Sequence, residues 1–285
     1  MYDTGGAAGP AVWPASSEPG PSADVWRRTP DGLSRTVSID RSWWSWGGVH
    51  GGYTASLGLE AMAAAVGDLR PVRALLIAFL TPIDERPLVL APTVERVGGS
   101  TSVASLRAEQ GGAPVLLATA TFGAVGPGPT YVGLTAPAVP DPDACAPMPL
   151  PQGPVPFAQH LEIRPASSGR VLAGGDRAEL IAWLRFADHR TVDAAGVTVL
   201  LDALAPGLYA TMTVPIPMPV VQLSIEFTDE LIGEPVDGWI LVRIRTDHAG
   251  GGWVTDDSTA WSADGRLLAQ ARQARRVLTR RTTDR

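Results

Sequence analysis

The chain has 285 residues, of which 45% are hydrophobic and 18% charged, and its formal net charge is -6. This length allows two domains of ordinary size, and the composition excludes a chain that is disordered throughout. The negative charge argues against a nucleic-acid partner, and we expect the dense basic stretch from Arg272 to Arg281 to be a solvated strand edge and tail. The single cysteine, Cys145, lacks a partner for a disulfide or a metal site. Without a signal pattern or a run of roughly 18 apolar residues, the sequence predicts a cytoplasmic protein with no membrane partner.

Two stretches rich in proline and glycine divide the chain. Residues 1–30 lack apolar periodicity and are expected to form a flexible leader. Residues 126–156 contain ten prolines, which interrupt every helix or strand there, and are expected to form a linker. We therefore expect folded units at residues 31–125 and 157–280, followed by a tail at 281–285.

The two units share sequence motifs in the same order, which indicates a duplicated domain. The segment Pro71–Phe79 matches Pro219–Phe227 as P-V-x-x-L-x-I-x-F. Further along, Leu116–Ala120 matches Leu267–Ala271 as L-L-A-x-A. Two matches at nearly the same separation predict that both units have the same fold.

Each unit is expected to contain an early strand, one apolar helix and then several strands with alternating side chains. In the first unit the predicted helix runs from about Tyr53 to Val66; in the second it begins near Asp193 and ends before Pro206. The predicted strands cover residues 71–80, 87–96, 102–110, 114–123, 219–228, 238–246, 252–262 and 266–276. A meander of antiparallel strands wrapped around one helix is an α+β arrangement, and two in tandem predict a double hotdog.

The residues His50, Gly51 and Gly52 lead into the first helix. Glycines here let the backbone turn and expose the free N–H groups of the helix N-terminus, which can polarise a carbonyl or hold an anionic oxygen. They can equally be a tight connection, and His50 can either donate to a ligand or satisfy the turn. We therefore take the three residues as candidates for substrate binding.

Two polar residues in the second unit interrupt apolar faces. Asp202 shares a face with Thr198 on an otherwise apolar helix, and if that face borders a cavity, Asp202 is suited to act as a general base. Gln273 continues the face of Leu267, Ala269 and Ala271 in the last strand, where its amide requires a partner or a ligand. Asp202 and Gln273 are therefore candidate catalytic residues.

Several short motifs resemble the bacterial acyl-CoA thioesterase II group, the double-hotdog thioesterases. They are V-H-G-G-Y before the first helix, L-L-D in the second helix and G-R-L-L-A-Q-A-R-Q in the last strand, and the likeness covers roughly residues 30–278. The resemblance implies an Asp, a Thr and a Gln that bind and activate the attacking water. The Asp falls on Asp202 and the Gln on Gln273.

The Thr of the resemblance falls on Val220, which cannot hydrogen-bond a water. By alternation Gln222 and Ser224 are expected to lie on the same face of that strand, and we take Ser224 as the candidate replacement. This departure from the family pattern makes a weakened hydrolase an open alternative.

The resemblance implies hydrolysis of a fatty-acyl thioester of coenzyme A or of a carrier protein, within lipid metabolism and with no metal or other cofactor. Hotdog sheets commonly pair edge to edge, so an internal pseudo-dimer and a homo-oligomer of whole chains are expected. Two alternatives stay open: a dehydratase-like enzyme, which would need a histidine such as His50, and a non-catalytic acyl-binding protein. The other histidines are His160, His189 and His248.

Overall fold

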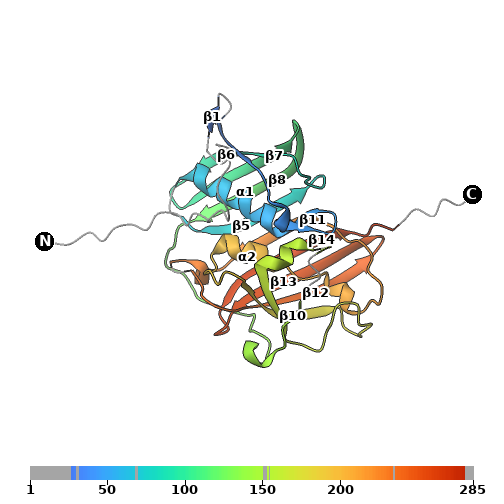
Figure 1. Cartoon of the computed structure of the whole chain (residues 1–285). Coiled ribbons are helices and arrows are strands. Elements are labelled where there is room, and N and C mark those ends of the chain that lie inside the picture. Colours follow the sequence, from blue (N-terminus) through green and yellow to red (C-terminus); the bar gives the residue numbers. More distant parts are fainter. Residues whose placement is uncertain are drawn as a thin grey trace, which may run out of the picture.

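The structure is a computed structural model that describes residues 27–29, 32–67, 70–149, 153, 155–233 and 235–279. Two repeats lie next to each other and share one twelve-stranded sheet, which curves around a helix from each repeat (Figure 1). This is the expected tandem hotdog of the α+β class. The predicted leader lies outside the described residues except for Arg27–Thr29, which form strand β1, and the predicted tail lies outside them entirely.

The first repeat wraps a sheet around helix α1. Its strands are β2 (Gly32–Val37), β6 (Leu88–Val97), β7 (Thr101–Gln110), β8 (Ala113–Gly123) and β5 (Val72–Phe79), in spatial order after β1. Helix α1 (Gly51–Val66) starts two residues before the predicted position and ends at Gly67, whose positive φ of 66° closes the helix in the left-handed conformation. Gly58 brings the helix close to the sheet, because a Cβ there would lie 2.9 Å from Leu106.

The second repeat has the same plan. Its strands are β11 (Val220–Phe227), β14 (Leu267–Arg276), β13 (Trp253–Ser262), β12 (Ile240–Gly250), β10 (Glu179–Phe186) and β9 (Leu161–Pro165), in spatial order. Helix α2 (Ala194–Leu201) is capped by Asp193, as predicted, but ends earlier than the proline requires. Its last turn tightens, since the Asp202 N–H reaches back to the Val199 carbonyl at 3.3 Å.

The two repeats join through the strands that carry the shared P-V-x-x-L-x-I-x-F motif. Strands β5 and β11 pair antiparallel, with Leu75 opposite Ile225 and Ile77 opposite Leu223. These pairs place equivalent residues of the two repeats in equivalent positions, so the junction has a local pseudo-twofold relation. The expected edge-to-edge pseudo-dimer within the chain is therefore confirmed.

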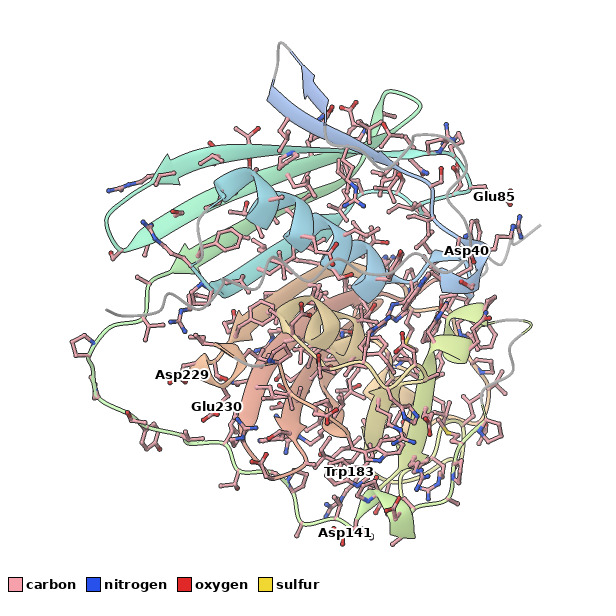
Figure 2. All side chains as sticks on the ribbon, turned by 60° about the vertical axis from the view of Figure 1, so that its left-hand side comes forward. Asp40, Glu85, Asp141, Trp183, Asp229 and Glu230 are labelled. Atoms are coloured by element: carbon pink, nitrogen blue, oxygen red, sulfur yellow. The ribbon has the colours of Figure 1, made fainter. Side chains whose placement is uncertain are left out.

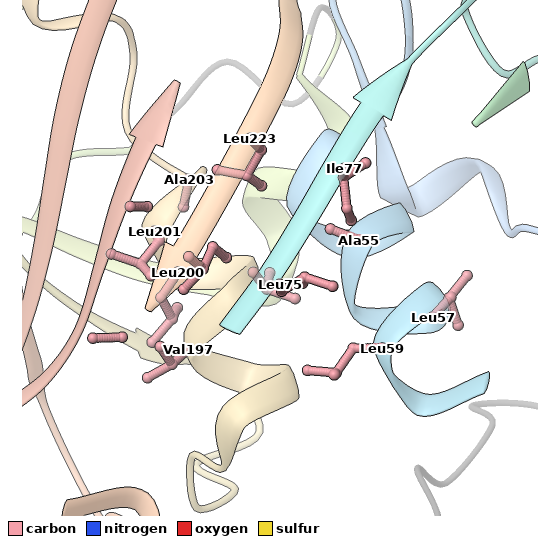
Figure 3. Close-up of a cluster of buried hydrophobic side chains, with 14 of the residues drawn as sticks. Ala55, Leu57, Leu59, Leu75, Ile77, Val197, Leu200, Leu201, Ala203 and Leu223 are labelled. Atoms are coloured by element: carbon pink, nitrogen blue, oxygen red, sulfur yellow. The ribbon is translucent and has the colours of Figure 1, made fainter. Parts of the chain in front are cut away.

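The core lies between the sheet and the two helices, which pack against each other. Leu75, Ile77 and Leu223 project from the junction strands toward α1 and α2, as Figure 3 shows. Both helices are apolar on nearly every side, which matches burial between a sheet and a second helix. The core of one repeat therefore continues into the core of the other.

The segment predicted as a linker runs along the outer face of the second sheet. Trp183 donates its indole N–H to the Pro140 carbonyl at 2.9 Å, and Figure 2 shows Trp183 beside the segment that carries Asp141. Ala136 and Val139 pack on the same tryptophan-rich cluster. Within the described residues, no helix is long and apolar enough to cross a membrane.

Candidate active site

Asp202 lies where the two repeats meet, directly after the last residue of α2. Its side chain is only 8% exposed. The carboxylate atom Oδ2 accepts a hydrogen bond of 2.8 Å from the backbone N–H of Gly52, in the first turn of α1. A carboxylate at a helix N-terminus is stabilised by the unpaired N–H groups and by the helix dipole. The candidate base of the second repeat is thus held by the helix of the first.

Gly51 and Gly52 permit this close approach. A Cβ on Gly51 would lie 2.8 Å from Asp202 Oδ2, and one on Gly52 would lie 2.9 Å from the Thr198 carbonyl oxygen. Both distances are shorter than real Cβ contacts, so a side chain at position 51 would displace the Asp202 carboxylate and one at position 52 would press on the backbone of α2. No hydrogen-bond partner for the Gly51 N–H is found among the described residues. This N–H is available to a substrate oxygen beside the Asp202 carboxylate.

His50 is the N-cap of α1 and is almost completely buried, with 2% of its surface exposed. Its Nδ1 accepts from the Tyr53 N–H at 3.1 Å, so the ring proton lies on Nε2, which is 3.1 Å from the Asp202 carbonyl oxygen. Burial lowers the pKa of His50, and the nearby Asp202 charge only partly opposes this. Both nitrogens of the neutral ring are bonded within the protein. This favours a role of His50 in capping the helix over the alternative that His50 donates to a ligand.

Gln273 is fully buried and faces α2, as the alternation of its strand predicted. Its Nε2 donates to the Leu201 carbonyl at 3.2 Å, and its Oε1 accepts from Arg275 Nη2. Gln273 is therefore bonded to Leu201, the residue before Asp202, and holds the end of α2 in place. Thr198 shares the helix but turns its hydroxyl to the Ala194 carbonyl, 2.8 Å away, rather than toward Asp202.

Two charged residues that the sequence interpretation missed complete the site. Arg275 was expected in a solvated basic edge, but its side chain is 7% exposed and its Nε donates to Asp256 Oδ2 at 2.8 Å. Asp256 is fully buried, and burial raises its pKa against the opposing effect of Arg275. The alternation of side chains along the strand could have revealed Arg275, because it lies two residues after Gln273 and therefore shares the inner face.

Ser224 does not lie in this site. The pairing of β11 with β14 contains a β-bulge between Val220 and Gln222, which reverses the alternation that the sequence suggested. Ser224 lies opposite Arg272, whose exposed side chain is on the outer face, whereas Val220 lies opposite the buried Arg275. The prediction that Gln222 and Ser224 share the face of Val220 is wrong for this reason.

The resulting arrangement is a buried carboxylate with donors on two sides. Asp202 Oδ2 is held by Gly52, and Asp202 Oδ1 lies 3.7 Å from Arg275 Nη2. A carboxylate in this setting can accept a proton from a water, and the adjacent helix N-terminus can stabilise a developing oxyanion. In the described part of the chain, no three His, Cys, Asp or Glu side chains gather in a way that could hold a metal ion.

Two family models match the chain. The model described as the acyl-CoA thioesterase N-terminal domain matches residues 40–123, and the acyl-CoA thioesterase C-terminal domain matches residues 142–277. Together they span more than half of the chain, and the matched segments contain every residue of the site. No curated protein matches the chain.

Solved structures with the same fold come from several bacteria. A hot dog fold protein of Alicyclobacillus acidocaldarius is 25% identical, with 90% of this chain and 97% of that one covered and a TM-score of 0.81. A Novosphingobium aromaticivorans protein assigned to the thioesterases is 24% identical (89% and 98% covered, TM-score 0.74). The acyl-CoA thioesterase II of Mycobacterium marinum is 19% identical (87% and 94% covered, TM-score 0.70). These likenesses establish the fold, and with the two matched domains they mean that this chain belongs to the acyl-CoA thioesterase family.

Proposed function

We propose that this protein hydrolyses acyl-CoA thioesters with a water activated by Asp202. The observation that carries the proposal is the contact between Asp202 Oδ2 and the Gly52 N–H at 2.8 Å. It places a buried carboxylate beside the Gly51 N–H at the N-terminus of α1, so that a proton acceptor and an oxyanion donor lie next to each other. Membership of the acyl-CoA thioesterase family supports coenzyme A as the thiol.

In the proposed reaction the thioester carbonyl oxygen accepts from the Gly51 N–H. A water oxygen attacks the carbonyl carbon and forms the new C–O bond, while one water proton passes to Asp202 Oδ1. The tetrahedral intermediate then breaks its C–S bond, and the proton moves from Asp202 to the leaving sulfur. The products are the free acid and coenzyme A, and Asp202 returns to its ionised form.

Gln273 acts in this scheme through the end of α2. Its hydrogen bond to the Leu201 carbonyl holds the residue before Asp202, and its Oε1 is tied to Arg275. Gln273 thereby holds the backbone next to Asp202, and the Gly52 N–H holds the Asp202 carboxylate itself. Precise orientation of this kind contributes to rate because small displacements of a reacting group are costly.

A dehydratase-like reaction is the second candidate, and one observation favours it. His50 Nε2 and Asp202 Oδ2 are 3.9 Å apart and come from different repeats, so a histidine and an acid do lie together. The ring proton, however, is directed to the Asp202 carbonyl oxygen rather than to open space. We therefore place hydrolysis ahead of dehydration.

Release of free thiol from straight-chain acyl-CoAs of graded length tests the proposal, with 3-hydroxyacyl-CoA and an acyl-carrier thioester as further substrates. Wild type is expected to release thiol from at least one acyl-CoA, and Asp202→Asn is expected to abolish this release. Formation of an enoyl product without thiol release would favour the dehydratase. A tightly bound acyl ligand that is never turned over would instead identify an acyl-binding protein.

A further inference from the structure

The guanidinium of Arg275 is bound on three sides inside the site. Its Nε donates to Asp256 Oδ2 at 2.8 Å, its Nη1 donates to the Met218 carbonyl at 3.3 Å, and its Nη2 donates to Gln273 Oε1. A guanidinium has five N–H donors in a fixed planar fork, so these bonds set the direction of the remaining ones. These three bonds hold the Arg275 side chain in one orientation within the site.

Nη2 has a second N–H besides the one bonded to Gln273, and Nη2 lies near the Asp202 carboxylate, the candidate base. Arg275 Nη2 and Asp202 Oδ1 are 3.7 Å apart, which is too long for a direct hydrogen bond. One water at about 2.8 Å from each atom fits this separation, donating to the carboxylate and accepting from the guanidinium. Such a water keeps a second lone pair for attack on a carbonyl carbon.

The opposite strand offers nothing else to hold this water. Val220 lies directly across from Arg275 in the β11–β14 pairing and has no hydrogen-bonding group in its side chain. The Gln273 amide is bonded to the Leu201 carbonyl and to Arg275, and no hydrogen bond from Gln273 to the Asp202 carboxylate is found among the described residues. Within the described site, Arg275 is therefore the side chain best placed to bind the water together with Asp202.

We propose that Arg275 is a catalytic residue that binds the attacking water. Val220, which lies opposite Arg275, has no hydroxyl that could bind this water instead. This inference rests on the proposed hydrolysis and adds a residue to it. Arg275 keeps its proton and its charge throughout: the water proton goes to Asp202, and Arg275 contributes only the hydrogen bond that fixes the water oxygen. Asp256 provides a buried counter-charge for the guanidinium, and the Asp202 carboxylate 3.7 Å from Nη2 provides a second.

The test must separate this role from simple neutralisation of Asp256. Asp256→Asn removes the buried charge and serves as the reference variant, because the amide oxygen can still accept from Arg275 Nε while the amide NH₂ donates to the Thr246 hydroxyl oxygen. Asp256→Asn/Arg275→Met then removes Arg275 without leaving an unpaired buried carboxylate, and circular dichroism and the Tm show whether both variants fold. Arg276→Met is the matched control, because Arg276 is the next residue and is exposed on the other face of the strand.

Relative to Asp256→Asn, the double variant is expected to lose about 100-fold in kcat for acyl-CoA hydrolysis, with KM within about twofold. Adding Val220→Thr to the double variant is expected to restore at least about tenfold in kcat, since the hydroxyl supplies a new hydrogen-bonding group for the water. Arg276→Met is expected to behave as wild type. A double variant with the kcat of Asp256→Asn, or a loss that Val220→Thr does not reverse, would overturn the role of Arg275 and leave the hydrolase intact. Absence of hydrolysis by wild type would overturn the proposed function as well.

Discussion

The two repeats present the same architecture but different chemistry at equivalent places. Both helices begin with a side-chain cap that accepts from the N–H three residues on: His50 in α1 and Asp193 in α2. Nine residues after these caps stand Leu59 in the first repeat and Asp202 in the second. Leu59 is buried and directed toward α2, as Figure 3 shows. The place that holds a carboxylate in one repeat is a packed leucine in the other.

The same contrast continues in the last strand of each repeat. When β8 and β14 are aligned on their L-L-A-x-A motif, Gln273 corresponds to Phe122 and Arg275 to Ala124. Phe122 is buried in the apolar core. The helix starts differ in the complementary sense, because α1 begins with Gly51 and Gly52 and α2 begins with two alanines.

The start of α1 meets the end of α2 at Asp202, which forms a polar junction, whereas the equivalent position of α1 is the buried Leu59, which forms a packed junction with α2 (Figure 3). The polar junction requires glycines because the Asp202 side chain occupies the space that a Cβ would fill. The packed junction needs no such space, and alanine strengthens its helix. We infer that a single junction carries the chemistry, which the following predictions test in order of decreasing effect.

Asp202→Asn should lower kcat/KM for acyl-CoA hydrolysis by about 10³-fold, because the amide cannot accept a proton while its oxygen still fits the Gly52 N–H. Asp193→Asn makes the same chemical change at the start of α2, where Asn remains a good N-cap. Its activity should stay close to that of wild type. Equal losses in the two variants, measured by thiol release, would remove the difference between the junctions.

Gly51→Ala should lower activity by about 100-fold, since the new Cβ would lie 2.8 Å from Asp202 Oδ2 and would displace the carboxylate. The reciprocal change, Ala194→Gly at the start of α2, should cost only about 0.5–1 kcal/mol of stability and leave the activity unaltered. Steady-state kinetics and thermal unfolding of both variants measure the contrast. An active Gly51→Ala enzyme would mean that the carboxylate position is not critical.

Gln273→Ala should reduce kcat about tenfold and destabilise the protein by about 1–3 kcal/mol, because the Leu201 carbonyl and an Arg275 N–H lose their buried partner. Gln270→Ala removes the same side chain from the outer, exposed face of the strand. Denaturant unfolding and kinetics should show neither effect in that control. A Gln270 variant as impaired as the Gln273 variant would contradict the assignment of the inner face.

His50→Asn should change the pH dependence of stability by a smaller amount. Burial lowers the pKa of His50 below its ordinary value, so the neutral ring stabilises the fold fully above about pH 6.5 and this contribution is lost as the pH falls through the folded-state pKa. Asn keeps an N-cap and does not titrate. Unfolding between pH 7.5 and 5 should therefore show a flatter profile for the variant, and parallel profiles would disprove this role.

Most of the fold could be predicted from the sequence because alternation and the repeated motif report directly on the sheet. The predicted strands agree with the structure to within a few residues, including the two that form the junction. Asp202 and Gln273 could be found because each is a polar group on an apolar face. Their approach to α1 could not be predicted, since it depends on how two helices from different repeats pack.

The remaining site residues were missed or misplaced for physical reasons. Arg275 sits in a run of basic residues whose other members include the exposed Arg272 and Arg276, and only its face distinguishes it. Asp256 lies in a strand where buried positions also carry serine, so its polarity gave no contrast. Ser224 was misplaced because a β-bulge shifts alternation by one residue without a distinct sequence signature.

Calorimetric titration with a non-hydrolysable thioether analogue of a hydrolysed acyl-CoA tests the central claim most directly, because it counts functional junctions. One analogue bound per chain is the predicted result, since the proposal places the thioester group at a single junction, where Asp202 meets Gly51 and Gly52. Two analogues bound per chain with similar affinity would contradict the account, because the packed junction at Leu59 would then be a site as well.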